Sequence, residues 1–430
     1  MRLKSGLFFL WIILITTACE RALPMPAEPT PLPPVLVSPN ALTAEPPDPA
    51  AQSLVLWSLL PPDSELALKE VVDTFNARNP WRIQVKVEAP GSAPEVGTRL
   101  KAAIQAGQPP DLLIVPDELL PELQEMEVMS DEIGHLAQEK TWHLSPPAEA
   151  DLYLNTFPWG TPTSRAGYVV APVRLQVLAL AYNPDVLRKA GVSDEAPRTW
   201  EAFEGSCRAF LEATNRPCLT FQPQADVFLN LAWTLGSTFL QTPNATSPDE
   251  GLRLAAVLLR ALADNGAALP LNTQEEALKA ALSGKAAFAL VSTATLPPAE
   301  PSKWAIAPPP AVDDKPVLLA SSFLMVVLKT GDPNRELAAW LFVRDYLVSP
   351  EQQARLADAN ALPIGQQAAR RLADESPLAA AFEWLSFARP RPLSPKWTIL
   401  APQMEQVAVQ LLNRKLSPDE AISRLKGAAE

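Results

Sequence analysis

An apolar run from Val169 to Ala181 is the feature of this sequence that most constrains its fold. The run contains Pro172 and two polar residues, Arg174 and Gln176. A stretch rich in β-branched residues and bounded by turn residues predicts a buried strand. Because the run exceeds the roughly five or six residues of a typical strand, we expect it to leave one domain and enter another without a break.

The residues after this strand predict two helices. Tyr182-Asn183-Pro184-Asp185 is typical of a turn and helix cap, with Pro184 at the first helical position. The first helix, Val186–Ala190, ends at Gly191. Thr199 is the expected N-cap of the second helix, since Thr is a preferred N-cap residue. The acidic first turn after it also favours a helix start here.

The size and charge of the chain limit its organisation and its partners. The chain has 430 residues and a formal net charge of −12, a length that favours two domains, each with a sizeable core. Nucleic-acid binding needs clustered Lys and Arg. The basic residues here are scattered among acidic ones, so we expect no nucleic-acid partner.

Few residues of the chain are suited to catalysis or metal binding. The two histidines, His135 and His143, are eight positions apart, which is not the spacing of a helical metal pair. The sequence contains no G-x-S-x-G, G-x-G-x-x-G or Walker-type motif. We therefore expect no metal, no cofactor and no enzymatic activity, although an extracytoplasmic hydrolase remains an alternative.

The first 51 residues have the pattern of an export signal followed by a tether. Arg2 and Lys4 precede the apolar segment Leu7–Ile15, which is typical of a secretory signal peptide. Thr16-Thr17-Ala18-Cys19 resembles the lipobox of bacterial lipoproteins, so we expect a signal peptide at 1–18 and a lipid on Cys19; ordinary cleavage is the alternative. Proline-dense residues 19–51 then predict an extended tether.

Export also bears on Cys207 and Cys218. An oxidising compartment permits a disulfide between them, but sequence alone does not give the distance between their Cα atoms. The pair is therefore predicted only as a candidate disulfide.

The folded part begins with a β-α-β-α-β pattern. Strands are predicted at Leu54–Leu59, Ile83–Val87 and Asp111–Val115, with helices at Asp63–Asn76 and Glu95–Gln105 between them. Strands and helices that alternate at this spacing predict a parallel sheet with right-handed crossovers.

Several motifs in this order resemble the extracellular solute-binding proteins of bacterial sugar ABC importers, including maltodextrin-binding members. The motifs are Trp57 at the end of the first strand, Phe75-Asn76 with Pro80, and Ala103-Ile104 with Gly107 and Pro110-Asp111. Further along come Tyr182-Asn183, Pro197-Arg198-Thr199-Trp200, Gly284-Lys285-Ala286-Ala287-Phe288 and Asp419-Glu420-Ala421. The resemblance covers roughly residues 54–425, which is nearly all of the predicted folded chain.

The resemblance implies an α/β fold of the type II periplasmic-binding-protein class. Two lobes, each a mixed sheet flanked by helices, would be joined by hinge crossings. The expected first lobe comprises residues 54–173 and 285–315, and the expected second lobe residues 174–284 and 316–430. A ligand would bind in the cleft between the lobes, outside the carboxyl ends of the strands.

Candidate ligand-binding residues follow from the loops after the strands and from the family's usual contact positions. They are Trp57, Asp117, Glu118, Gln176, Gln222, Asp226, Phe228, Ser292, Thr293 and Ser321. Gln176 is the sharpest of these predictions, because a polar side chain in a buried strand needs a partner or a cleft. The aromatic candidates could equally be core residues, and Asp117 and Glu118 could be a solvated helix cap.

The resemblance implies a lipid-anchored, extracytoplasmic, monomeric solute-binding protein that captures a sugar or related solute and delivers it to a permease. Two alternatives remain open within the same fold. One is a diverged lipoprotein that senses or scaffolds, and the other is a binder of a non-sugar solute. The apolar loop Leu59-Leu60-Pro61-Pro62, where maltodextrin-type members carry charged contacts, motivates the first of these alternatives.

Overall fold

The computed structural model describes residues 47–131, 133–241, 245, 247–297, 303–312, 316–357, 361–393 and 395–429. The predicted signal peptide, Cys19 and most of the predicted tether lie outside these residues. Within them, no helix combines the length and the apolar character needed to cross a membrane.

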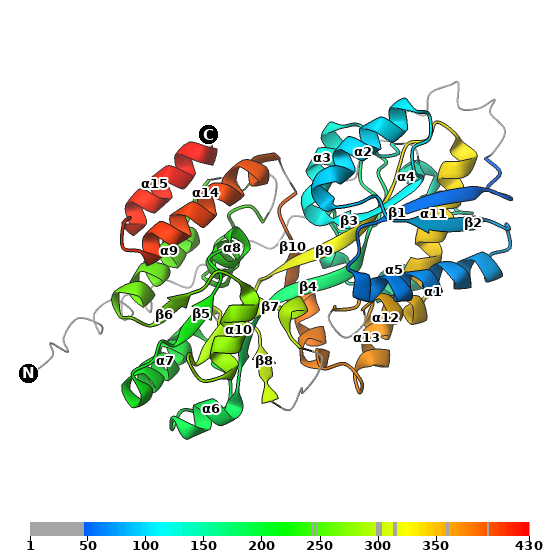
Figure 1. Ribbon diagram of the computed structural model, residues 1–430. Helices are drawn as coiled ribbons and strands as arrows, with labels where there is room; N and C mark the ends of the chain where they lie inside the picture. Colours follow the sequence, from blue (N-terminus) through cyan, green and yellow to red (C-terminus); the bar gives the residue numbers. More distant parts are fainter. Residues whose placement is uncertain are drawn as a thin grey trace, which may run out of the picture. The chain divides into compact units, whose positions relative to one another are not determined.

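The strands form one mixed sheet in the order β2-β1-β3-β9-β4-β7-β5-β6, with β10 beside β9 and β8 beside β4 (Figure 1). Their bounds are β1 Ser53–Ser58, β2 Gln84–Glu88, β3 Leu112–Pro116, β4 Val170–Tyr182, β5 Leu219–Phe221, β6 Ala268–Pro270, β7 Phe288–Ser292, β8 Ala305–Ala307, β9 Leu318–Val327 and β10 Ala388–Pro390.

Helices cover this sheet. They are α1 Pro62–Arg78, α2 Ala93–Gln105, α3 Leu120–Glu125, α4 Ile133–Leu136, α5 Pro146–Asp151, α6 Pro184–Lys189, α7 Trp200–Thr214, α8 Ala225–Thr234, α9 Glu250–Asp264, α10 Gln274–Leu282, α11 Pro333–Val348, α12 Pro350–Ala357, α13 Gln366–Leu372, α14 Pro395–Leu412 and α15 Pro418–Ala429. Short 3₁₀ helices include η3 Asp117–Leu119, η4 Leu154–Thr156, η5 Thr293–Thr295 and η8 Ala379–Phe387.

The first lobe contains the predicted β-α-β-α-β unit, which the structure confirms. Strand β1 pairs in parallel with both β2 and β3, and α1 buries Leu68, Val71, Val72 and Phe75 against the sheet. The spacing of these apolar residues repeats about every turn of an α-helix, so one face of α1 packs on the core. Strand β9 completes this side of the sheet by pairing antiparallel with β3.

Strand β4 is shared by both lobes, as the length of its apolar run predicts. Its first part, from Val170 to Val177, pairs with β9, and its last part, from Leu178 to Tyr182, pairs with β7. All thirteen residues except Gln176 are buried. A strand that is buried on both faces reads as a continuous apolar run, which explains the sequence pattern.

The second lobe is built on β5, β6 and β7, where β5 pairs in parallel with the other two. Its helices include α8, α9, α14 and α15, which pack against one another. The predicted caps are present: the Asn183 side chain accepts a hydrogen bond from the Asp185 N–H at α6, and Thr199 accepts one from Ala202 at α7. Cys207 and Cys218 form a disulfide with a Cα–Cα distance of 5.1 Å.

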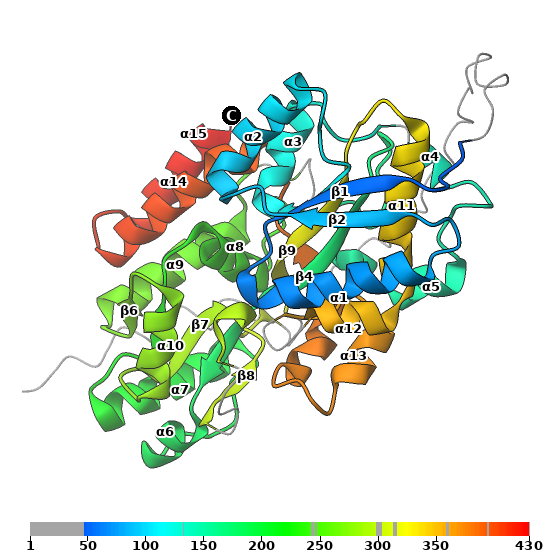
Figure 2. The same ribbon diagram turned by 45° about the vertical axis from the view of Figure 1, so that its right-hand side comes forward.

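The packing differs from the lobe boundaries predicted at 284 and 316. Strand β7 pairs with β4 and β5 in the second lobe, whereas α11 and α12 pack against α1 in the first (Figure 2). The physical reason is that the chain returns to the first lobe along β9, which spans both lobes beside β4. It leaves again after β10, so α14 and α15 belong to the second lobe.

Candidate functional site

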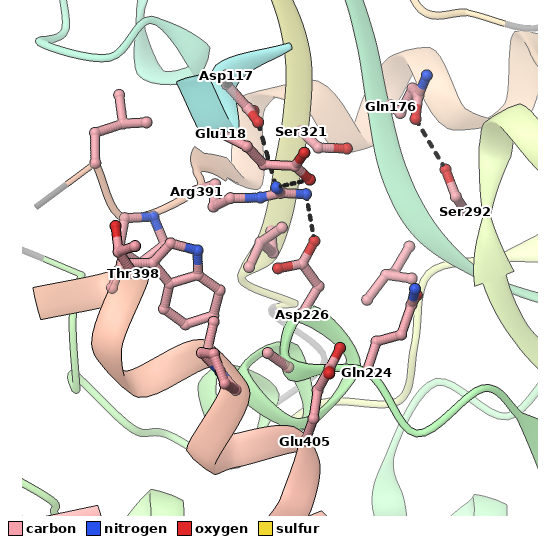
Figure 3. Close-up of a pocket in the computed structure, with 18 of the residues that line it drawn as sticks. Asp117, Glu118, Gln176, Gln224, Asp226, Ser292, Ser321, Arg391, Thr398 and Glu405 are labelled. Atoms are coloured by element: carbon pink, nitrogen blue, oxygen red, sulfur yellow. Dashed lines mark hydrogen bonds and ion pairs between the residues drawn. The ribbon is translucent and has the colours of Figure 1, made fainter. Parts of the chain in front are cut away.

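A pocket of about 470 Å³ lies where the two lobes meet (Figure 3). Its wall combines residues that follow β3, the middle of β4 and β9, the end of β7, the N-terminus of α8, the segment after β10 and one face of α14. Ligands of α/β proteins bind outside the carboxyl ends of the strands, and β3 and β7 end at this pocket. A volume in the range of roughly 300–1,000 Å³ suits a small molecule.

Arg391 is the centre of the charged part of the pocket. It comes directly after β10 and is 9% exposed. Its guanidinium donates to Glu118 and, at 2.5 Å, to Asp226, and it lies 3.5 Å from Asp117 (Figure 3). Asp117 and Glu118 follow β3 in the first lobe, whereas Asp226 is in the first turn of α8 in the second lobe. One arginine therefore links both lobes across the pocket.

Burial dominates the protonation of these carboxylates. It raises the pKa of Asp117 to about 6, despite the opposing effects of Arg391 and the Ser322 N–H, which donates to Asp117 at 2.7 Å. Burial also raises the pKa of Asp226. For Arg391, burial alone would lower the pKa, but Asp117, Asp226 and Glu118 together raise it. The guanidinium of Arg391 therefore stays charged, and three carboxyl groups share this one positive charge.

A chain of amide and hydroxyl groups forms the opposite wall. Ser292 Oγ donates to Gln176 Oε1 at 3.3 Å. The backbone N–H of Ser292 donates to Gln274 Oε1 at 2.6 Å, and Gln274 Nε2 donates to Gln224 Oε1 at 2.9 Å. Amide groups carry both donors and acceptors, so this wall can donate hydrogen bonds to hydroxyl groups and also accept hydrogen bonds from them.

The structure explains why Gln176 interrupts the apolar strand. It is the one residue of β4 that is not buried, and its register partner across β9 is Ser321. Both residues line the pocket, and Ser292 is the register partner of Leu178 two positions further along β4. Neighbouring strands thus place three polar side chains within two register positions of one another, at the pocket.

Six of the ten predicted ligand residues line the pocket. They are Asp117, Glu118, Gln176, Asp226, Ser292 and Ser321. A seventh, Gln222, lines a neighbouring groove.

Three predicted residues lie elsewhere. Phe228 is 1% exposed and packs within the second-lobe core, like nearly all other residues of α8. Thr293 is buried, and its Oγ1 accepts the backbone N–H of Val177. Trp57 packs on the apolar cluster of β3 and α3 rather than in the pocket wall. These three residues therefore lie outside the pocket wall, at packing or structural positions.

Sequence reasoning missed Arg391, Gln274 and Glu405, which also line the pocket. Arg391 does stand between two prolines after a short strand, but its acidic partners are 273 and 165 positions away. No local pattern identifies such a partner. Within the described residues, no group of His, Cys, Asp and Glu is arranged to hold a metal ion.

Comparison with known proteins gives a family and a set of structures. A model of the bacterial extracellular solute-binding protein family matches residues 70–380. The cyclic α-maltosyl-1,6-maltose binding protein of Arthrobacter globiformis aligns with a TM-score of 0.75 and 19% identity, over 88% of this chain and 97% of that one. No curated protein matches the sequence.

Two further structures have the same architecture. The sugar-binding protein MalE from Xanthomonas citri aligns with a TM-score of 0.72 and 21% identity, over 88% of this chain and 96% of that one. A solute-binding protein of an ABC transporter from Thermotoga lettingae, bound with α-D-tagatose, aligns with a TM-score of 0.64 and 20% identity, over 88% and 99%. At these identities the alignments establish the two-lobe fold.

Proposed function

Because the chain belongs to the bacterial extracellular solute-binding protein family, we propose that it captures a sugar or related polyol for an ABC importer. The solute would bind in the pocket between the lobes, and no bond would be made or broken. The solved structures with this fold include proteins described as binding maltose-type saccharides and tagatose, which supports the choice of solute class.

The observation that carries the proposal is the mixed donor and acceptor character of the pocket wall. Asp117 and Asp226 present carboxylate oxygens, Arg391 presents N–H donors, and Gln176 and Ser321 present groups of both kinds. A sugar hydroxyl both donates and accepts a hydrogen bond. A wall of this composition can therefore satisfy several hydroxyls of one solute.

The position of these groups also supports closure of the lobes around the solute. Asp117 belongs to the first lobe and Asp226 to the second, while β4, β9 and the segment after β10 connect the lobes. A solute that contacts both carboxylates binds more tightly when the lobes are close together, so it favours the closed state. The hydrogen-bonded chain from Gln176 to Gln224 joins the crossing strand β4 to the second lobe.

Anchoring and delivery complete the proposal. A lipid on Cys19 would hold the protein at the outer face of the cell membrane, and the proline-rich segment would act as its tether. The permease subunits of the importer would then receive the solute, with the protein acting as a monomer. Mass spectrometry of the membrane-extracted protein would detect a lipid-modified Cys19, and an unmodified N-terminal segment would contradict anchoring.

One observation favours a second candidate, a cationic non-sugar solute. Asp117, Glu118 and Asp226 surround the single guanidinium of Arg391, and Glu405 also lines the pocket. An amine on the solute would balance this excess of negative charge. The two candidates differ in charge, because only a cationic solute would use the excess of negative charge in the pocket.

A thermal-shift screen of the lipid-free protein tests both candidates. The panel would contain neutral mono- and oligosaccharides, polyols, amino sugars and simple diamines. We expect neutral saccharides to raise the melting temperature with the logarithm of the ligand excess, since a ligand at 100 times its Kd stabilises the folded protein by about 2.7 kcal/mol. Stabilisation by amines alone would overturn the sugar assignment in favour of the second candidate, and stabilisation by none of the panel would contradict both.

A further inference from the structure

We propose that the pocket is one end of a longer ligand site, which continues into a glutamine-lined groove on the second lobe. The inference rests on the proposed function and makes it more specific: the solute is an elongated, polyhydroxylated molecule whose distal segment is uncharged. This glutamine groove is defined by Gln222, Gln224, Asn272, Gln403, Gln406 and Gln410, and its volume is about 660 Å³.

The groove and the pocket are continuous. Gln224, Pro402 and Glu405 line both of them. Figure 3 shows Gln224 and Glu405 below Asp226 in that view. A solute that fills the pocket can therefore extend past these residues directly into the groove.

The topology of the sheet also places the groove where ligands bind. Gln222 directly follows β5, and Asn272 comes two residues after the end of β6. Because β5 and β6 are neighbouring parallel strands, their carboxyl ends open at the same edge of the sheet, which is the usual ligand side of α/β folds. The groove thus shares its edge with the pocket residue Ser292 at the end of β7.

Helix α14 faces both parts of the site with two different stripes. Trp397, Ala401 and Glu405, spaced by four residues, line the pocket. The second stripe contains Gln403, Gln406 and Gln410, spaced by three and four residues, and it lines the groove. Residues at such spacing share a helix face, so adjacent faces of one helix connect the pocket and the groove.

The chemistry of the groove selects neutral hydroxyl groups over anions. Among the described residues, its lining contains no Lys or Arg. The side chains of Gln222, Gln403 and Gln406 make no hydrogen bond to other described residues, whereas Gln410 accepts one from Arg424 at 2.8 Å. Three amides are therefore available to a solute, and each has two donors and an acceptor.

Because the groove is continuous with the pocket, we expect the distal segment of the same ligand to occupy it. Every lining element of the groove, from the loops after β5 and β6 to α14, belongs to the second lobe. The groove therefore does not depend on closure of the lobes, and it adds contacts only for a solute long enough to reach it. We infer that affinity increases with the length of the saccharide.

The test is a calorimetric titration of a length series. The saccharide type that stabilises the protein most in the screen is titrated as the monomer, dimer, trimer, tetramer and hexamer, into the wild type and Gln403→Ala/Gln406→Ala. We expect wild-type affinity to rise with length, and the variant to lose about three- to tenfold per amide for the long saccharides only. Alanine is a good helix former, so the variant keeps α14, and Gln105→Ala on the exposed face of α2 is the matched control.

The outcomes separate this inference from the function on which it rests. Binding of short saccharides with no gain for longer ones overturns the groove while the sugar-binding function stands. An equal loss for the shortest and the longest saccharide in the variant also overturns it, because the groove amides would then act on the pocket. Absence of binding for every saccharide overturns the sugar-binding function, and the inference with it.

Discussion

Two arginine–carboxylate clusters, each built around a buried aspartate, have different roles in this protein. In the first lobe, Arg335 donates two hydrogen bonds to Asp111, at 2.8 and 2.7 Å, and the Val55 N–H donates a third at 2.7 Å. One cation meets one carboxylate within a single lobe. At the pocket, Arg391 meets Asp117, Glu118 and Asp226 from two lobes.

Burial alone does not distinguish the clusters, because burial raises the pKa of both Asp111 and Asp117. The difference is in the balance of charge and hydrogen bonds. Asp111 has a bidentate partner that matches its geometry, whereas Arg391 has three acidic neighbours, and its buried Nε makes no hydrogen bond to other described residues. We call Arg335–Asp111 the matched pair, because one cation meets one carboxylate, and it stabilises the first lobe. We call Arg391 with Asp117, Glu118 and Asp226 the unmatched cluster, because it has more acids than cations, and a solute can bind to its groups.

Removal of the matched pair should have the largest effect on stability. Asp111→Ala leaves the guanidinium of Arg335 and the Val55 N–H without an acceptor, so we expect a loss of about 3–5 kcal/mol in the free energy of unfolding. Urea denaturation measures this loss. The control is Asp131→Ala, whose exposed pair with Lys329 should contribute less than about 1 kcal/mol; equal losses in the two variants would contradict the structural role of Asp111.

The unmatched cluster should make stability depend on pH. Because the folded protein raises the pKa of Asp117 to about 6, above the value of about 4 in an unfolded chain, it binds the proton more tightly than the unfolded chain does. This stabilisation is complete below pH 4 and is lost as the pH rises through 6. Between pH 4 and 7.5 we expect the wild type to lose about 2–3 kcal/mol relative to Asp117→Asn.

Urea denaturation of both proteins at a series of pH values measures that difference. The variant carries no titrating carboxyl at this position, so subtraction removes the contributions of the other groups. A difference between the two proteins that stays constant from pH 4 to 7.5 would show that Asp117 keeps an ordinary pKa. The cluster would then be matched in charge, like the pair in the first lobe.

Removal of the pocket cation should act mainly on binding. Arg391→Gln removes charged donors from a buried site, and we expect the affinity for the bound saccharide to fall about 10- to 100-fold. Isothermal titration calorimetry measures this change. Arg389→Gln, on the exposed side of the same strand β10, is the matched control; unchanged affinity in Arg391→Gln would assign Arg391 to structure alone.

The smallest effect is expected at the neutral wall. Gln176→Ala removes one amide that faces the pocket, which should weaken saccharide binding by about three- to tenfold while the unliganded fold keeps its stability. Calorimetry and thermal denaturation of the same sample separate the two quantities. Equal affinity in the variant would make β4 a crossing strand without a role in recognition.

Sequence reasoning succeeded where signals are local. The length of the Val169–Ala181 run predicted a strand shared by two lobes, and Asn183 and Thr199 predicted helix caps, because each signal lies within a few residues. The position of Phe228 could not be predicted, since every residue of α8 except Asp226 is buried and the sequence shows no apolar face.

The centre of the site depends on long-range contacts. Arg391 meets Glu118 and Asp226 across separations of 273 and 165 residues, so only the fold brings them together. The return of the chain along β9 was missed for the same reason, because strand order in a sheet is set by pairing between distant segments. The sequence therefore predicts the elements and several pocket residues but not the cluster that joins the lobes.

A crystal structure of the lipid-free protein with its bound saccharide would show whether the pocket between the lobes is the binding site. We expect saccharide oxygens within hydrogen-bond distance of Gln176 and of at least one member of the Arg391 cluster, with both lobes contacting the solute. A saccharide bound elsewhere, with the pocket between the lobes empty, would contradict it.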